Sequence, residues 1–105
     1  MDKKIFFQIK KIAARLKKKY NAEQVILFGS YASGEEKADS DVDLLIIAPT
    51  TEPFYQRMAT TLQLVRDLYR ELPISPIVLR PEEIEKRRRR GDQFVQEIIE
   101  EGVKM

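Results

Sequence analysis

Two short polar motifs interrupt apolar runs, and their residue types could do chemistry together. Gly29-Ser30 ends the apolar run 25–28, while Asp41 and Asp43 open a second apolar run that continues to Ile47. Side chains two residues apart in a strand point to the same face, roughly 6 to 7 Å apart. The sequence therefore predicts two carboxylates side by side next to a hydrophobic core, which is costly unless a partner neutralises them.

A divalent cation such as Mg²⁺ would neutralise this carboxylate pair. Mg²⁺ takes oxygen ligands and often shares them with the phosphates of a bound substrate. Asp41 and Asp43 are therefore the candidate metal ligands and the candidate catalytic residues. The chain contains no histidine and no cysteine, which excludes imidazole bases, thiol nucleophiles, thiolate zinc sites and disulfides.

Gly29 and Ser30 are the candidate phosphate-binding residues. Glycine lets a backbone approach a ligand closely, and the first amides of a helical turn after it would point at an anion. The Ser30 hydroxyl would add another donor. Gly-Ser and Asp-x-Asp are each common in ordinary turns, so the functional hypothesis depends on both motifs occurring in adjacent elements that can fold together.

The elements that would position these motifs follow from the spacing of apolar residues. The expected helices cover residues 2–20, about 51–71, 80–90 and 92–101, and the expected strands cover residues 24–28, 41–47 and 74–79. Pro76 indicates an edge position or a bulge for the third strand, because proline cannot donate to a sheet ladder. This order predicts one α/β domain over residues 1–105, with helices packed on a small mixed sheet of three or four strands.

Composition limits the class of protein. With 105 residues, 43% of them hydrophobic and 34% charged, the chain can form one globular domain with a modest core. No apolar run approaches the ~20 residues of a membrane helix, and the N-terminus lacks the features of a signal peptide. The net charge of +2 does not by itself indicate a nucleic-acid binder. Abundant Lys, Arg and Glu without cysteine favours a heat-adapted cytoplasmic protein.

The central motifs resemble the signature of the polymerase-β-like nucleotidyltransferase superfamily, namely Gly29-Ser30, ten residues, and Asp41-Val42-Asp43. The stretch 28–34 and the short length resemble the minimal nucleotidyltransferases, often the antitoxin half of a HEPN–MNT toxin–antitoxin pair. The resemblance covers roughly residues 5–103, although only the central motif is highly specific. It implies the polymerase-β-like fold, with Mg²⁺ on the two aspartates and the phosphates of a nucleoside triphosphate, usually ATP, on Gly29 and Ser30.

The resemblance also implies an activity and a partner. An acceptor hydroxyl would attack the α-phosphorus in line, and pyrophosphate would leave. In the antitoxin group the acceptor is a tyrosine of the HEPN toxin, so we expect a Mg²⁺-dependent protein adenylyltransferase that acts on a HEPN-family protein encoded by the neighbouring gene. A chain this small lacks room for a second domain that grips the base or the acceptor, so specificity would come from another protein or from a homodimer.

One position departs from the family pattern. Active members usually carry a third carboxylate six residues ahead of the Pro-Glu-Glu helix start, where it helps to bind metal and to deprotonate the acceptor. That position is Ser75 in this chain, and a serine does neither well. The alternative hypothesis is therefore a non-catalytic module that binds nucleotide or neutralises a toxin by forming a complex.

A run of five cations, Lys86 to Arg90, stands apart from the central motifs. A basic last turn is ordinary compensation of the helix dipole, so the favoured interpretation is a solvated helix end. The alternatives are a clamp for the triphosphate or a contact with RNA. No aromatic residues are interleaved with the run, which argues against stacking on a single strand, and nucleic acid is not an expected partner.

Overall fold

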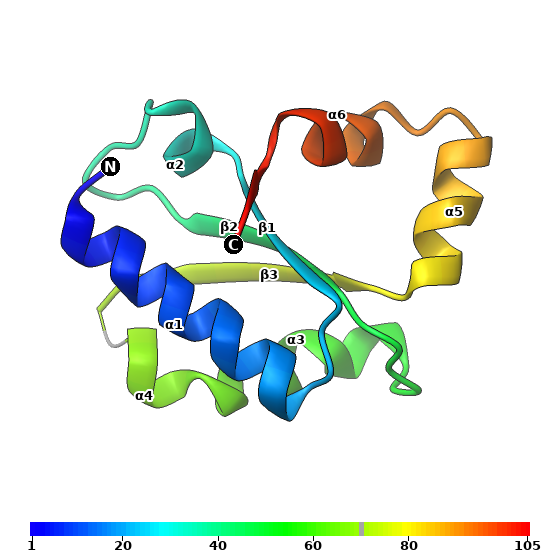
Figure 1. Cartoon of the computed structure of the whole chain (residues 1–105), viewed down its shortest axis with the longest axis horizontal. Helices are drawn as coiled ribbons and strands as arrows, with labels where there is room; N and C mark the ends of the chain where they lie inside the picture. Colours follow the sequence, from blue (N-terminus) through cyan, green and yellow to red (C-terminus); the bar gives the residue numbers. More distant parts are fainter. Residues whose placement is uncertain (70) are drawn as a thin grey trace.

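The computed structural model describes residues 1–69 and 71–105 and shows a four-stranded mixed sheet with helices on both faces (Figure 1). The helices are α1 (Lys3–Lys19), α2 (Ser30–Ser33), α3 (Phe54–Leu64), α4 (Arg66–Tyr69), α5 (Pro81–Arg89) and α6 (Gln93–Glu101). The strands are β1 (Gln24–Phe28), β2 (Val42–Ile47), β3 (Ile74–Leu79) and β4 (Val103–Lys104). The expected α/β fold with a small mixed sheet is confirmed.

The sheet has the strand order β3-β2-β1-β4. β1 is antiparallel to both β2 and β4, whereas β2 and β3 are parallel. β3, which contains Pro76, is an edge strand, as the proline indicates. Within the described residues, no helix is long and apolar enough to cross a membrane.

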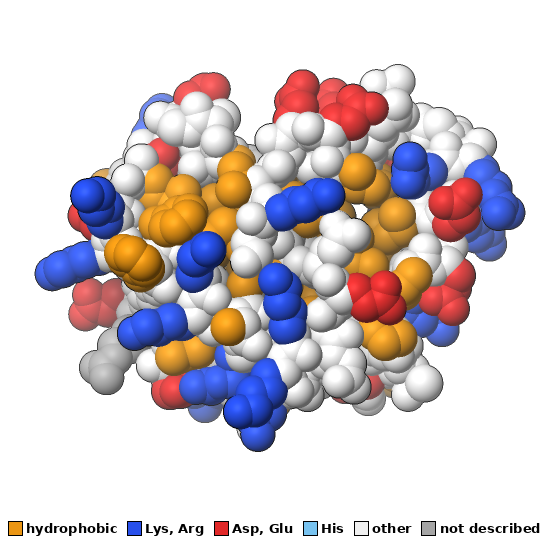
Figure 2. Space-filling view, in the orientation of Figure 1, with side chains coloured by type: hydrophobic (Ala, Val, Ile, Leu, Met, Phe, Trp, Pro, Cys, Tyr) orange, Lys and Arg blue, Asp and Glu red, His pale blue; other side chains and the backbone are white. Residues whose placement is uncertain are grey.

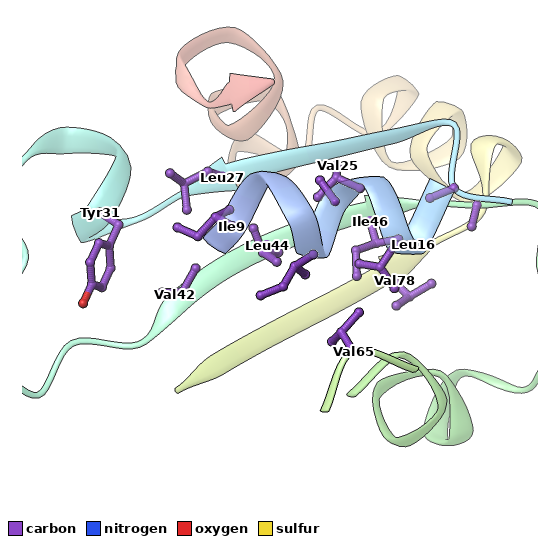
Figure 3. Packing of buried hydrophobic residues seen from close by; sticks show 14 residues of the cluster. Ile9, Leu16, Val25, Leu27, Tyr31, Val42, Leu44, Ile46, Val65 and Val78 are labelled. Atoms are coloured by element: carbon purple, nitrogen blue, oxygen red, sulfur yellow. The ribbon is translucent and has the colours of Figure 1, made fainter. Parts of the chain in front are cut away.

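β2 is a central strand whose two faces belong to different layers. Its even-numbered residues pack against α1 and the α3–α4 segment in one core cluster (Figure 3); they are Val42, Leu44 and Ile46. Leu45 and Ile47 belong to a second cluster, to which α5 and α6 contribute. Burial on both faces explains the uninterrupted apolar run. Because side chains alternate along a strand, Asp43 lies on the same face as Leu45 and Ile47.

The single helix expected over 51–71 is two helices, and residue 70 within that range lies outside the described residues. α3 ends at Leu64, and α4 begins at Arg66. Between them Val65 leaves the helical conformation and buries its side chain in the first core cluster, where it is 2% exposed. Arg15 stabilises the break, because its guanidinium donates to the free Leu64 carbonyl at 3.0 Å.

The fourth strand, β4, lies at the other edge of the sheet. Val103 and Lys104 pair with Leu27 and Ile26 of β1, and the Met105 amide donates to the Val25 carbonyl at 2.8 Å. The C-terminus thereby runs alongside β1 (Figure 1). This pairing closes the edge of β1, the strand that leads into the Gly29-Ser30 motif.

A buried arginine ties α3 to β3 and α5. The Arg57 side chain is 3% exposed and donates to the Val78 carbonyl at 3.1 Å and to the two Glu83 carboxylate oxygens at 2.7 and 3.3 Å. Burial raises the pKa of Glu83, but hydrogen bonds from Arg57 and from the Arg80 amide lower it. The positive charges of the Arg57 and Arg80 side chains lower it further, so the pKa is lowered overall. Glu83 is therefore a compensated anion.

Candidate active site

Gly29 joins β1 to α2 with backbone angles of φ 74° and ψ −153°, which residues other than glycine rarely adopt. A Cβ atom built at this position would overlap the carboxylate of Asp43. The sheet register explains the contact, since Phe28 of β1 lies opposite Asp43 of β2. The structure thus places the backbone of the Gly-Ser motif directly against one acid of the Asp-x-Asp motif.

Ser30 begins α2, which is a single helical turn. The Gly29 carbonyl accepts hydrogen bonds from the Ala32 and Ser33 amides at 3.1 Å, which leaves the amides of Ser30 and Tyr31 without a partner inside the turn. The Tyr31 side chain is 7% exposed and reaches into the first core cluster beside Val42, which anchors the turn (Figure 3). The anchored turn therefore presents amides that can receive an anion.

The two acids lie at the start of β2. Asp43 is half-buried, and Asp41 is exposed and immediately precedes the strand. Burial, and then the charge of Asp41, raise the pKa of Asp43 above its ordinary value. In the part of the chain that the structure describes, no Lys or Arg forms an ion pair with either carboxylate. The acids are thus uncompensated, as expected of residues that receive a cation.

Ser75 is the in-register neighbour of Asp43 on the parallel strand β3. Paired residues on neighbouring strands point to the same face, so the Ser75 side chain lies on the face of the sheet that carries Asp43. Over residues 1–69 and 71–105, no group of three or more acids, histidines or cysteines is placed to hold a metal. The site offers two carboxylates and a neighbouring hydroxyl, which fits Mg²⁺ only if water and phosphate oxygens complete its ligand set.

A pocket of about 370 Å³ adjoins Gly29, between α2 and α6 (Figure 2). Phe28 and Phe94 meet there edge to face, with their ring centroids 5.7 Å apart. Glu97 and Glu101, one turn apart on α6, also line it. These two acids belong to no motif of the sequence, and their helical spacing is the signal that would place them on one face of a helix.

The basic run lies at the opposite end of the molecule. It occupies the end of α5, whereas α2 and the two acids lie at the other end of the sheet (Figure 1). Ser75 and Leu79 are four residues apart on β3, which corresponds to roughly 13 Å along the strand. Arg80 caps α5 and pairs with Glu83 at 3.5 Å. The structure therefore does not bring Arg80 or the basic run to the two acids.

The tight geometry at Gly29 can be tested against a second glycine with a positive φ. Gly34 also has a positive φ, 78°, but a Cβ there would meet nothing within 4 Å. We expect Gly34→Ala to cost about 1 kcal/mol from backbone strain alone. Gly29→Ala puts a side chain at φ 74° and ψ −153°, a region nearly restricted to glycine, and also forces the Asp43 carboxylate to move, so it should cost at least about 1 kcal/mol more, measured by urea unfolding. Equal costs for the two variants would contradict the contact.

The charge of Asp43, which has no cationic partner among the described residues, predicts that removing it stabilises the fold. Because the folded-state pKa of Asp43 is raised, the fold favours the protonated carboxyl and is destabilised by the ionised carboxylate. The stability that the protonated form contributes is fully present below the unfolded-state pKa and is lost as pH rises through the folded-state pKa. Without divalent ions, Asp43→Asn should therefore raise Tm by a few degrees at pH 7, and the gain should shrink below about pH 4. The same substitution at Asp39, in the exposed loop, is the control. A lower Tm for Asp43→Asn at pH 7 would contradict the claim that the ionised Asp43 carboxylate destabilises the fold.

Comparisons with known proteins point to one family. The nucleotidyltransferase domain family matches residues 9–104. Two proteins of Methanocaldococcus jannaschii are similar over shorter stretches. "Putative protein adenylyltransferase MJ1379" is 46% identical over 44 residues, 42% of this chain and 41% of that protein. "Putative protein adenylyltransferase MJ1215" is 40% identical over 38 residues, 36% of this chain and 44% of that protein. The aligned stretches thus span less than half of each relative.

The fold also matches a solved structure. The crystal structure of a "putative nucleotidyltransferase" from Sulfolobus solfataricus superposes with a TM-score of 0.56 and 24% sequence identity, over 75% of this chain and 69% of that one. This likeness shows a shared fold. Since the family match covers nearly the whole chain, including both central motifs, the chain belongs to the nucleotidyltransferase domain family.

Proposed function

We propose that the chain is a Mg²⁺-dependent nucleotidyltransferase that moves AMP from ATP to a hydroxyl group of a partner protein. The observation that carries this proposal is the contact of Gly29 with Asp43, which sets the helical turn of Ser30 beside the Asp43 carboxylate, two residues after Asp41. Nucleotidyl transfer needs a polyphosphate grip and a metal site in one place. The names of the Methanocaldococcus relatives favour a protein as the acceptor.

In this proposal the two motifs divide the work. Asp41 and Asp43 hold the metal through their carboxylate oxygens, while the Ser30 hydroxyl and the amides of Ser30 and Tyr31 bind phosphate oxygens. Mg²⁺, when bound, supplies positive charge that neutralises the phosphates of the nucleotide. Gly29 exposes its backbone, so the polyphosphate can lie close to the chain.

The transfer itself exchanges one phosphorus–oxygen bond for another. The acceptor oxygen bonds to the α-phosphorus, the bond to the bridging oxygen breaks, and pyrophosphate leaves with that electron pair. The acceptor proton must pass to a base, and Ser75, the neighbour of Asp43, is not basic enough to take it. We therefore propose slow turnover that a carboxylate at position 75 would accelerate.

We further propose that the acceptor is a tyrosine of a HEPN-type toxin partner encoded by the neighbouring gene, so that the chain acts as an antitoxin. The resemblance of stretch 28–34 to the minimal nucleotidyltransferases supports this partner. A non-catalytic nucleotide-binding or antitoxin module is the second candidate. The hydroxyl at position 75, in register with Asp43, is the observation that favours it.

A label-transfer assay separates the two candidates. The chain is incubated with Mg²⁺, ATP labelled at the α-phosphate and the product of the neighbouring gene. Wild type should label the partner slowly, Asp43→Asn should abolish labelling, and Ser75→Asp should raise its rate by about tenfold or more, because a positioned base contributes at least that much. Equal labelling by wild type and Asp43→Asn would reject the enzymatic proposal.

Binding measured on the same variants completes the comparison. Calorimetry with a non-hydrolysable ATP analogue and Mg²⁺ reports nucleotide affinity, and co-purification reports complex formation with the partner. If wild type and Ser75→Asp bind nucleotide and partner but neither transfers label, the chain is a binding module. If wild type binds neither nucleotide nor partner, both candidates fail.

A further inference from the structure

A second pocket lies between the start of α3 and the last turns of α5, at the end of the molecule opposite α2 (Figure 1). We call it the basic pocket. It measures about 330 Å³, at the small end of the roughly 300–1,000 Å³ range of ligand sites. Its lining consists of Phe54, Leu79, Glu83, Lys86, Arg87 and Arg90.

Helix geometry divides the basic run between two sides of α5. Lys86, Arg87 and Arg90 line the basic pocket. Arg88 and Arg89 line a different hollow, together with Glu85 and Gln96. Four of the five cations are exposed, as expected of a solvated helix end, but three of the five line one pocket.

The positive charge of the basic pocket is largely uncompensated. Its one acid, Glu83, is held by Arg57 through two hydrogen bonds. Arg87 has a long contact with Asp92, at 3.8 Å. Among the residues that the structure describes, Lys86 and Arg90 form no ion pair. A pocket with this charge attracts an anion.

The fold adds an aromatic ring that the sequence does not place near the run. Phe54 comes from α3, 32 positions before Lys86 in the chain, and lines the same pocket. Its side chain is 58% exposed, which is unusual for phenylalanine, although the Arg57 guanidinium lies over the ring, 5.6 Å from its centroid, so a base would use the opposite face. Cations for a phosphate backbone and an aromatic face for a base are the two parts of a single-stranded nucleic-acid site.

We propose that the basic pocket binds single-stranded nucleic acid, with Lys86, Arg87 and Arg90 on the phosphates and Phe54 against a base. An acidic peptide would use the cations but has no base to stack on the exposed ring. The site is separate from the two acids and does not depend on nucleotidyl transfer.

Fluorescence anisotropy with a labelled 12-nucleotide oligouridylate, titrated with the full chain at several salt concentrations, tests this proposal. Lys86→Gln with Arg90→Gln should weaken binding about tenfold or more. The slope of log affinity against log salt concentration, the salt slope, should become less steep by about 1.4, which is about 0.7 for each lost phosphate contact. Arg88→Gln with Arg89→Gln removes the same charge from the other side of α5 and should change affinity less than about threefold. Equal losses of affinity for the two double variants would contradict binding at the basic pocket and would indicate a general attraction to the positive charge of α5.

The aromatic part has its own test. Phe54→Leu keeps an apolar side chain but removes the ring, and it should weaken binding about fivefold or more while leaving the salt slope unchanged. Tyr55→Leu, at a neighbouring exposed residue outside the pocket, is the control, and circular dichroism checks that each variant folds. Unchanged affinity for Phe54→Leu, or equal competition by a polyglutamate of the same length, would contradict the proposal and indicate a surface for acidic proteins.

Discussion

The missing side chain of Gly29 governs how this site is built. Because Gly29 has no Cβ, β1 ends directly against the carboxylate of Asp43, and the following turn presents its amides beside that acid. The same residue adopts backbone angles that other residues rarely accept. One glycine thus provides the close approach and the change of direction that the proposed polyphosphate grip requires.

The core makes the cost of this arrangement tolerable. Asp43 destabilises the fold when it is ionised, since burial and Asp41 both disfavour its charge. The next three residues of β2, Leu44, Leu45 and Ile46, are fully buried, and each such side chain contributes on the order of 1.5–3 kcal/mol. A strand that is packed on both faces can therefore carry an unfavourable acid at its start. A cation bound there would remove that penalty, which couples ligand binding to stability.

The two halves of the molecule differ in how far the sequence predicted them. Apolar runs and their polar ends predicted β1 and β2 and indicated that the two motifs could fold together, whereas the antiparallel pairing that sets Phe28 opposite Asp43 is seen only in the structure. The break at Val65 was not predictable, since apolar spacing continues through it and tertiary contacts, the burial of Val65 and the hydrogen bond from Arg15, stabilise it. The pair Val103 and Lys104 is too short to show strand periodicity. The basic pocket depends on the fold bringing Phe54 of α3 to α5, and the basic run itself contains no aromatic residue that would indicate it.

Paramagnetic NMR on the labelled chain tests the central claim most directly. Substoichiometric Mn²⁺ with a non-hydrolysable ATP analogue replaces Mg²⁺ and broadens amide signals close to the metal. We expect the signals of Gly29, Ser30, Val42 and Ser75 to broaden first, and we expect Asp41→Asn with Asp43→Asn to abolish the effect. Broadening centred on α5, or broadening that survives in the double variant, would contradict a metal–nucleotide site formed by these two motifs.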